Sequence, residues 1–421
     1  TGPAGPPVAP YRDDRLARPG VCRGTGAEGP VSASGLQVGG WREVREADPY
    51  ATHSHPLELL LFALIPFPLT IPQINLPLPE IAAVALIARA SFRAPDRTVT
   101  RPTWFPVLLW GLWAWFVAVA LVTGVDGTRR IAHLLIYVLL ALCLASGRLH
   151  RLSAVRGLAV GVGLGAITGF LGGSLGFQTG YGDRLTGLFS DPNVAGFTMI
   201  VLGSLAVAGA RTGFRRWIGL VGLATAVTLT LSRTSIIAAI LGIIWLVLRR
   251  LLPGRWALPV MGALSVVVVE YAADFKQWGP FSDREGSDVL RELILIQERI
   301  VLDSSPWIGR GPGTAYVNID GDFFFFHNSY FALRAEAGWI GLAIFVALGL
   351  LLLWKLVALP TELRHPWYAA SLIMTGVCAM NLGEVLLEIP AAVAIGVACR
   401  HLTKPVVLLP GDTENTPNHV L

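Results

Sequence analysis

Residues 104–123 read WFPVLLWGLWAWFVAVALVT, twenty consecutive residues without a charged side chain. The hydrocarbon core of a bilayer is about 30 Å thick, and roughly 20 apolar residues of α-helix cross it. The rest of the chain agrees, because 53% of its 421 residues are hydrophobic and only 14% are charged, against about 25% charged residues in a soluble chain. The stretch therefore predicts a membrane-embedded helical protein.

Apolar runs continue on both sides of this stretch. They predict an all-α polytopic membrane protein with about twelve transmembrane helices, the first, second and last of them short or interrupted by proline. The expected spans are 57–72, 76–91, 104–123, 131–146, 157–173, 193–210, 215–231, 234–252, 256–273, 329–354, 366–384 and 386–400.

Basic residues between the spans indicate an orientation. With a cytoplasmic N-terminus, the inside connections hold sixteen Lys and Arg residues in tight clusters, namely Arg93, Arg97, Arg101, Arg148, Arg151, Arg156, Arg211, Arg215, Arg216, Arg249, Arg250, Arg255, Lys355, Arg364, Arg400 and Lys404. The outside connections hold nine, and five of these lie in one long segment. Because cytoplasmic loops are enriched in Lys and Arg, we expect an inner (plasma) membrane protein with both termini in the cytoplasm.

The remaining composition divides the chain and excludes some function classes. Residues 1–56 are rich in Gly, Pro, Ala and Arg and predict a disordered cytoplasmic extension, while 405–421 predict a polar cytoplasmic tail. Between them lie spans at 57–273 with an outer loop at 174–192, a long extracytoplasmic loop at 274–328, and spans at 329–404. The net charge of +5 is too small to indicate nucleic-acid binding, and the four cysteines show no metal-ligand spacing.

Glycine recurs every fourth residue in the fifth span. Gly157, Gly161, Gly165, Gly169 and Gly173 line one helix face. Stripes of small residues let membrane helices approach closely. We therefore interpret the stripe as a packing surface and not as a ligand site.

The long loop at 274–328 is the first of two outer loops with polar residues of interest. Within it, Asp288–Leu302 predicts an amphipathic interfacial helix, with one face formed by Leu290, Leu293, Ile294, Gln297 and Val301, and Arg291 and Glu298 on another. Phe323–Phe326 are expected to re-enter the apolar zone just before His327. Asn328 and Ser329 suit the cap of the next span.

The second outer loop holds Arg184 and ends in Asp191-Pro192-Asn193, a typical cap and turn before a helix. A tight turn further along leaves Arg233 between two apolar spans, and a charge so close to hydrocarbon is costly and usually functional.

Three arginines and a histidine are thus expected on the outer face. Arginine offers a planar fork of donors for phosphate oxygens, and histidine can take a proton near neutral pH. Together they suit a reaction in which a lipid pyrophosphate leaves while an acceptor hydroxyl loses its proton. Taken singly, each Arg could instead be a loop salt-bridge residue and the His a helix cap.

These segments resemble the O-antigen ligase and polymerase superfamily of bacterial envelope glycosyltransferases. The resemblance covers roughly 180–350, and it rests on Arg184–Phe189 followed by Asp191–Asn193, Ser232-Arg233, Arg291 ahead of Ser305–Gly313, His327–Tyr330 and Glu336–Leu342. It implies a GT-C-like helical fold and a metal-independent hexosyl or glycan transfer from an undecaprenyl-pyrophosphate-linked donor, in cell envelope polysaccharide biosynthesis.

The resemblance also implies roles for these residues. Arg184, Arg291 and Arg233 would bind the donor pyrophosphate, and His327 would be the catalytic base. Asn328, Tyr330 and Glu336 would support them, with Arg334 as a partner for Glu336. No metal or cofactor is expected, although Asp320 and Asp322 leave a divalent-ion site open.

Three functions remain open at this stage. The shared motifs do not separate a ligase from a polymerase, which differ in whether the acceptor is another lipid-linked glycan. A transporter or lipid flippase is the alternative from another class, since about twelve spans would also suit it.

Overall fold

The computed structural model describes residues 54–73, 76–95, 102–174, 184–189, 191–210, 213–271 and 285–403. All of them belong to one compact unit. The predicted extension at 1–56 and tail at 405–421 fall almost wholly outside these residues. So do residues 175–183 and 190 of the loop at 174–192 and residues 274–284 of the loop at 274–328.

Helices dominate the described chain. In order, the elements are α1 (Pro56–Leu64), β1 (Thr70–Ile71), β2 (Leu76–Pro77), α2 (Leu78–Ser91), α3 (Trp104–Thr123), α4 (Thr128–Ala145), α5 (Arg151–Ser174), η1 (Gly187–Phe189), α6 (Pro192–Gly209), α7 (Phe214–Leu229), α8 (Arg233–Leu251), α9 (Gly254–Tyr271), α10 (Glu285–Asp303), β3 (Tyr316–Ile319), β4 (Asp322–Phe325), α11 (Ser329–Ala358), η4 (Thr361–Leu363), α12 (Pro366–Asn381) and α13 (Ile389–Leu402).

The helices lie where the apolar runs predict them. Six in the described part of the chain are long and apolar enough to cross a membrane, namely α3, α4, α5, α6, α8 and α11. The others are shorter or less apolar, so the full count of about twelve spans stays a prediction.

The first predicted span is the main departure. Helix α1 ends at Leu64, and the chain continues into the antiparallel pair β1–β2. Pro66 and Pro68 follow the helix directly, and proline lacks the N–H that would continue the hydrogen-bond ladder. The fold is therefore helical with two small hairpins, β1–β2 and β3–β4.

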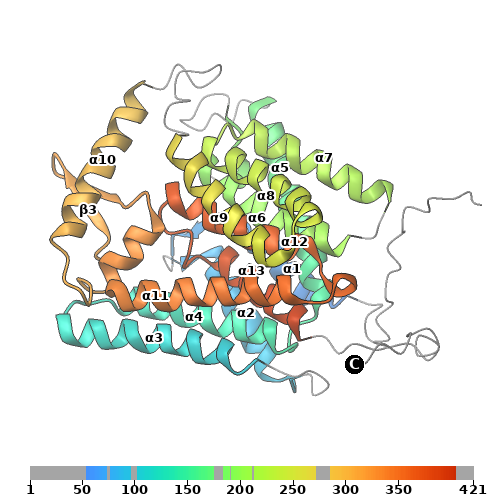
Figure 1. The fold of residues 1–421 in the computed structure, drawn as a ribbon, viewed down its shortest axis with the longest axis horizontal. Helices are drawn as coiled ribbons and strands as arrows, with labels where there is room; N and C mark the ends of the chain where they lie inside the picture. Colours follow the sequence, from blue (N-terminus) through green and yellow to red (C-terminus); the bar gives the residue numbers. More distant parts are fainter. Residues whose placement is uncertain are drawn as a thin grey trace, which may run out of the picture. The chain divides into compact units, whose positions relative to one another are not determined.

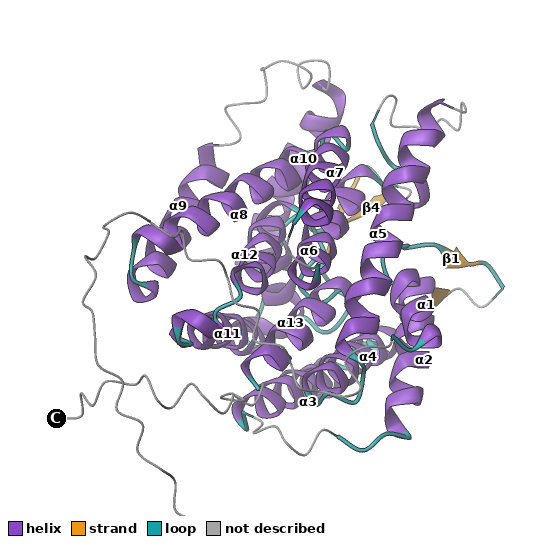
Figure 2. Cartoon of the chain, turned by 90° about the vertical axis from the view of Figure 1, so that its right-hand side faces the viewer, coloured by secondary structure: helices purple, strands orange, loops and turns teal. Residues whose placement is uncertain are grey.

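The core is formed by helices that are apolar all round. Most residues of α6 and α12, and the first eleven of α13, are buried. These helices occupy the middle of the view in Figure 2. Helices α3, α5 and α7 lie further out and expose large apolar side chains such as Leu121, Phe170 and Trp217. Such exposed apolar surface fits helices that face lipid.

Connections between helices gather at two opposite ends. At one end, which we call the Glu58 end, Arg93 reaches Glu58 and Arg148, Arg400 packs on Gly147, and Gly254 packs on Val357. At the other, the His327 end, Gly127 packs on Pro312, Arg130 pairs with Glu384, and Gly383 packs on Phe326 and His327. Figure 1 shows α3, α4 and α11 side by side between the two ends, with α10 and β3 at the His327 end. The described residues of the six connections predicted to be cytoplasmic lie at the Glu58 end.

Candidate functional site

The small-residue stripe of α5 positions the first predicted arginine. Gly157 and Gly161 face the backbone of α1, and a Cβ on Gly165 or Gly169 would lie 2.3 Å from Phe189 or 2.5 Å from Leu185. The packing interpretation is thus confirmed for these four glycines. Because Leu185 and Phe189 seat in the stripe, the short segment that begins with Arg184 is held against α5.

Arg184 reaches the start of two helices. Its Nε donates to Thr230 O at 3.0 Å, and its Nη2 donates to Asn193 Oδ1 at 3.3 Å. The same Asn193 oxygen accepts from the Ser232 hydroxyl at 3.0 Å. Arg184 therefore lies where α6 and α8 begin, beside the residue that precedes Arg233.

Side-chain caps fix both helix starts. Asp191 accepts from the backbone N–H groups of Asn193 and Val194, as predicted, and Ser232 accepts from the N–H of Ser235. The turn before α8 is tight, since Leu231 adopts a left-handed φ of 48°. Helix N-termini favour anions through their exposed N–H groups and the helix dipole.

The charge of Arg291, the predicted arginine on α10, acts on the histidine. Burial lowers the pKa of His327, the charge of Arg291 lowers it further, and Phe325 O and Asp191 act in the opposite direction. Arg291 on α10 and Asp191 ahead of α6 are thus both close enough to act on the imidazole. Asp191 precedes α6, the helix whose start Arg184 contacts, so His327 and Arg184 are both near that helix start. Four residues are half-buried, namely Arg184, Arg233, Arg291 and His327.

The imidazole is set in one tautomer. His327 Nδ1 lies 3.2 Å from Phe325 O. A carbonyl oxygen only accepts hydrogen bonds, so Nδ1 carries the proton in the neutral ring and Nε2 is the acceptor. Together with the lowered pKa, this leaves His327 as a neutral base at pH 7.

The phenylalanine run before His327 forms part of a β-hairpin. Phe323–Phe325 belong to β4 of an antiparallel hairpin, with Phe323 and Phe325 largely exposed and Phe326 buried. Their entry into the apolar zone of a membrane stays a prediction. The two-residue turn is Asp320-Gly321, both with left-handed φ, as in the type I′ turns that join short hairpins. The hairpin places Asp320 in its turn and Asp322 at the start of β4, and the described residues hold no cluster of three or more metal-ligating side chains.

Helix α10 also differs from its prediction. Its buried residues are Ile294, Glu298 and Leu302, while Leu290 and Leu293 are largely exposed. The helix docks through that face on Ala315 and Val317 and on the first part of α11. The predicted apolar face holds for Ile294 and Val301, which pack in this cluster, but not for Leu290 and Leu293. The difference arises because α10 is buried by the hairpin and α11, which helical periodicity alone does not reveal.

One of the supporting residues has local partners, and the other two have partners on distant helices. Asn328 caps α11 by accepting from the N–H groups of Tyr330 and Phe331, as predicted. The Tyr330 hydroxyl donates to Gly376 O on α12 at 3.1 Å. Glu336 pairs with Arg130 at 3.0 Å, whereas Arg334 lies over the Trp339 ring. The predicted Glu336–Arg334 pair was therefore wrong, and Arg130 was missed because it lies 206 residues away in the chain.

Two motif segments of the long loop and α11 interlock. Helix α11 breaks at Gly338, where φ is 65°, and a Cβ there would lie 2.1 Å from Trp307 O. Arg310 and Gly311 donate their N–H groups to Ala335 O and Glu336 O. The glycine-rich run 309–313 is thus a docking loop for a broken helix.

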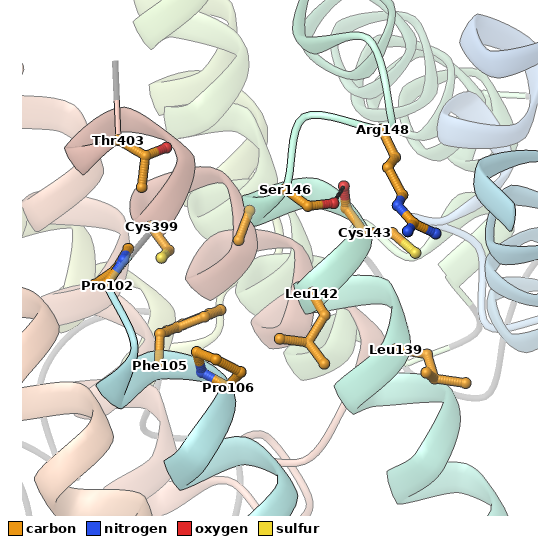
Figure 3. A pocket seen from close by; sticks show the side chains of 11 residues that line it. Pro102, Phe105, Pro106, Leu139, Leu142, Cys143, Ser146, Arg148, Cys399 and Thr403 are labelled. Atoms are coloured by element: carbon orange, nitrogen blue, oxygen red, sulfur yellow. Dashed lines mark hydrogen bonds between the residues drawn. The ribbon is translucent and has the colours of Figure 1, made fainter. Parts of the chain in front are cut away.

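A cavity of about 260 Å³ lies elsewhere (Figure 3). It is lined mainly by apolar side chains from the start of α3 and the ends of α4 and α13, together with Arg148 and Ser146. These helix ends belong to the Glu58 end, so this cavity is not part of the His327 site.

The fold and the site define a polytopic helical membrane protein whose arginines and histidine gather at one end. A family model described as O-Antigen ligase matches residues 218–346, which include Arg233, Arg291 and His327. The match supports the resemblance to the superfamily of O-antigen ligases and polymerases over this segment. It supports a glycosyltransferase-like role in polysaccharide biosynthesis at a membrane. A comparison with curated proteins found no match.

Proposed function

We propose that the protein is an O-antigen ligase-like glycosyltransferase. It moves a glycan from an undecaprenyl-pyrophosphate-linked donor to an acceptor hydroxyl on the outer face of the plasma membrane. The observation that carries this proposal is the gathering of Arg184, Arg233, Arg291 and His327 around the starts of α6, α8 and α11, in a chain that matches the O-antigen ligase family over 218–346.

The chemistry assigns a separate task to each group. Arg184 and Arg291 bind the pyrophosphate, with Arg233 as a third contact, and stabilise the negative charge that develops on it. His327 Nε2 takes the proton of the acceptor hydroxyl while its oxygen attacks the anomeric carbon. The bond from that carbon to the pyrophosphate oxygen breaks, and undecaprenyl pyrophosphate leaves. A single displacement of this kind inverts the anomeric centre and uses no metal ion.

One assay tests the function and its alternatives. Purified protein receives the lipid-linked glycan, a second lipid-linked glycan and a non-lipid-linked or glycolipid acceptor, without an energy source. We expect covalent transfer with inverted configuration, and the acceptor used separates a ligase from a polymerase. Movement of intact lipid-linked glycan without covalent transfer would favour the transporter or flippase, and a product with retained configuration would contradict the single displacement.

The sidedness needs its own measurement. We expect a cysteine at Asp320, in the exposed hairpin turn, to react with an impermeant thiol reagent from outside the cell, and a cysteine at exposed Arg255 to react only after permeabilisation. The reverse pattern would place the His327 end in the cytoplasm and remove the proposed donor.

A further inference from the structure

One carboxylate of α10 lies inside the protein. Glu298 is placed between Ile294 and Leu302 at four-residue spacing, and all three side chains are buried. Its Oε2 has no hydrogen-bond partner among the described residues. Burying a carboxylate without full pairing is costly, so packing alone would favour an apolar side chain at this position.

The other oxygen of Glu298 meets the main chain of the histidine. Oε1 accepts a hydrogen bond from the backbone N–H of His327. Burial raises the pKa of Glu298 to about 7, and the N–H groups of His327 and Asn328 oppose this rise. Both N–H groups adjoin the N-terminus of α11, where the helix dipole favours a negative group.

The same helix face carries Arg291. Arg291 and Glu298 are seven residues apart, which is about two turns of helix, so both lie toward the His327 corner. There Arg291 and Asp191 are the charged groups that act on the imidazole. Across α10, β3, β4 and α11, the described residues form no ion pair with Glu298. Helix α10 therefore carries both the proposed pyrophosphate contact, Arg291, and the carboxylate of Glu298 that accepts from the main chain of His327.

We propose that Glu298 is a positioning residue that fixes the main chain at His327 and so aims the imidazole at the acceptor hydroxyl. Docking of α10 then sets the donor contact Arg291 and the orientation of the base together. This inference rests on the proposed function of His327 and adds no step to the chemistry.

Three variants of the full-length protein test the role. Glu298→Ala removes the acceptor, Glu298→Gln keeps one amide oxygen in its place, and Asp303→Ala changes an exposed carboxylate on the same helix. We expect Glu298→Ala to lower kcat by about 10- to 100-fold, the effect of a small misplacement of a reacting group, with the donor KM unchanged. Glu298→Gln should restore most of the turnover, and Asp303→Ala should match the wild type.

Amide hydrogen exchange provides a readout that does not depend on the chemistry. Exchange in a peptide containing His327 and Asn328 should be faster in Glu298→Ala but not in Glu298→Gln or Asp303→Ala. Unchanged exchange in Glu298→Ala would overturn the contact, and faster exchange with unchanged kcat would overturn the positioning role. Should Glu298→Ala fail to fold, Glu298→Met fills the space without an acceptor and carries the same expectations. Failure of the proposed function would appear separately, as full turnover in His327→Ala.

Discussion

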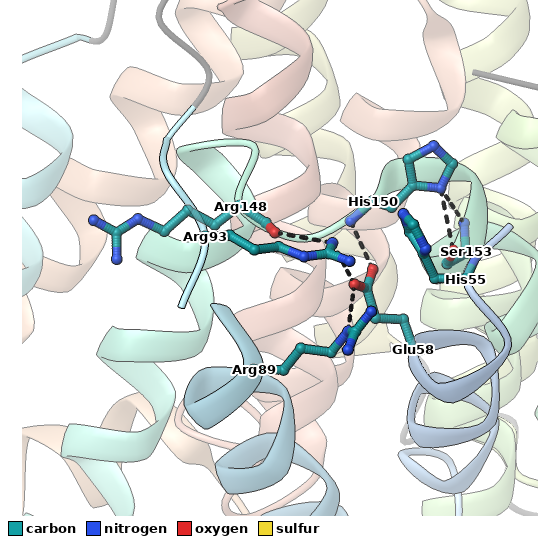
Figure 4. A network of polar contacts seen from close by, with 7 residues as sticks. All are labelled: His55, Glu58, Arg89, Arg93, Arg148, His150 and Ser153. Atoms are coloured by element: carbon teal, nitrogen blue, oxygen red, sulfur yellow. Dashed lines mark hydrogen bonds and ion pairs between the residues drawn. The ribbon is translucent and has the colours of Figure 1, made fainter. Parts of the chain in front are cut away.

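The two ends of the helix assembly use charge in different ways. At the Glu58 end, one buried carboxylate accepts from Arg89 at 2.9 Å and pairs with Arg93 at 2.5 Å, and it also accepts from the N–H of His150 (Figure 4). This network ties α1, α2 and the α4–α5 connection together. At the His327 end, Arg184 donates to the neutral oxygens of Thr230 and Asn193. The Glu58 carboxylate joins three segments of the chain and suits a structural role, whereas the Arg184 contacts join the starts of α6 and α8.

Backbone conformation separates the ends in the same way. All three non-glycine residues with left-handed φ in the described chain, Leu231, Asp320 and Glu384, lie at the His327 end. Asp320 is explained by its hairpin turn. Leu231 precedes Ser232-Arg233, and Glu384 follows the glycine that packs on His327. Such conformations cost about 1–3 kcal/mol and gather at functional sites, which again distinguishes this end.

The largest expected effect compares one histidine from each end. His327→Ala should lower turnover by roughly 100- to 10,000-fold, the usual contribution of a positioned general base, while donor binding stays near wild type. His150→Ala, beside the Glu58 network, should leave turnover of the folded protein unchanged. Near wild-type turnover of folded His327→Ala would reduce His327 to a helix-entry residue and remove the distinction between the ends.

A second comparison uses two arginines. Arg291→Lys keeps the charge but loses the planar fork, and loss of one charge-assisted hydrogen bond costs about 1.5–3 kcal/mol. We expect activity to fall by ~10- to 100-fold, with weaker binding of undecaprenyl pyrophosphate. Arg93→Lys, at the Glu58 end, should leave donor binding unaltered. Equal donor affinity in wild type and Arg291→Lys would argue against a pyrophosphate contact.

The Glu58 network should control stability and not activity. Glu58→Ala leaves two arginines and the His150 N–H without their carboxylate, and we expect a loss of about 2 kcal/mol because the arginines are partly exposed and can be solvated. The measurement is thermal unfolding in detergent, with specific activity of the folded fraction as control. A selective loss of activity without loss of stability would show that the Glu58 end takes part in the reaction.

The smallest effect is a shift in pH dependence. Because the pKa of His327 lies below 6.5, its neutral form persists as the pH falls through 6.5, and kcat should decline only at lower pH. The charge of Arg291 contributes to this lowering, so Arg291→Gln should raise the pKa of His327 and move the acid limb to higher pH. The kcat profile is best measured in Glu298→Gln, which removes the second group that titrates near neutrality. An unmoved limb would indicate that Arg291 does not act on the imidazole.

Periodic and local features were predictable from the sequence. Apolar runs located the helices, the glycine stripe indicated close packing, and Asp191 and Asn328 were recognised as caps, because each of these depends on neighbours within a few residues. Arg184, Arg233, Arg291 and His327 were found because they are polar residues close to apolar spans.

The tertiary structure decided which of these local features meet. The sequence placed Glu298 on a polar helix face, but in the structure α10 docks on α11 and Glu298 accepts from the main chain of His327. Glu336 pairs with Arg130 on a distant helix and not with Arg334. The break at Gly338 became visible only with the loop 305–313 packed against it. By itself the sequence determined the helices, their caps and the residue types at the connections between helices. Burial and long-range pairing depend on how the helices pack, and helical periodicity does not specify that packing. Only the tertiary structure therefore decided that α10 contacts the main chain of His327.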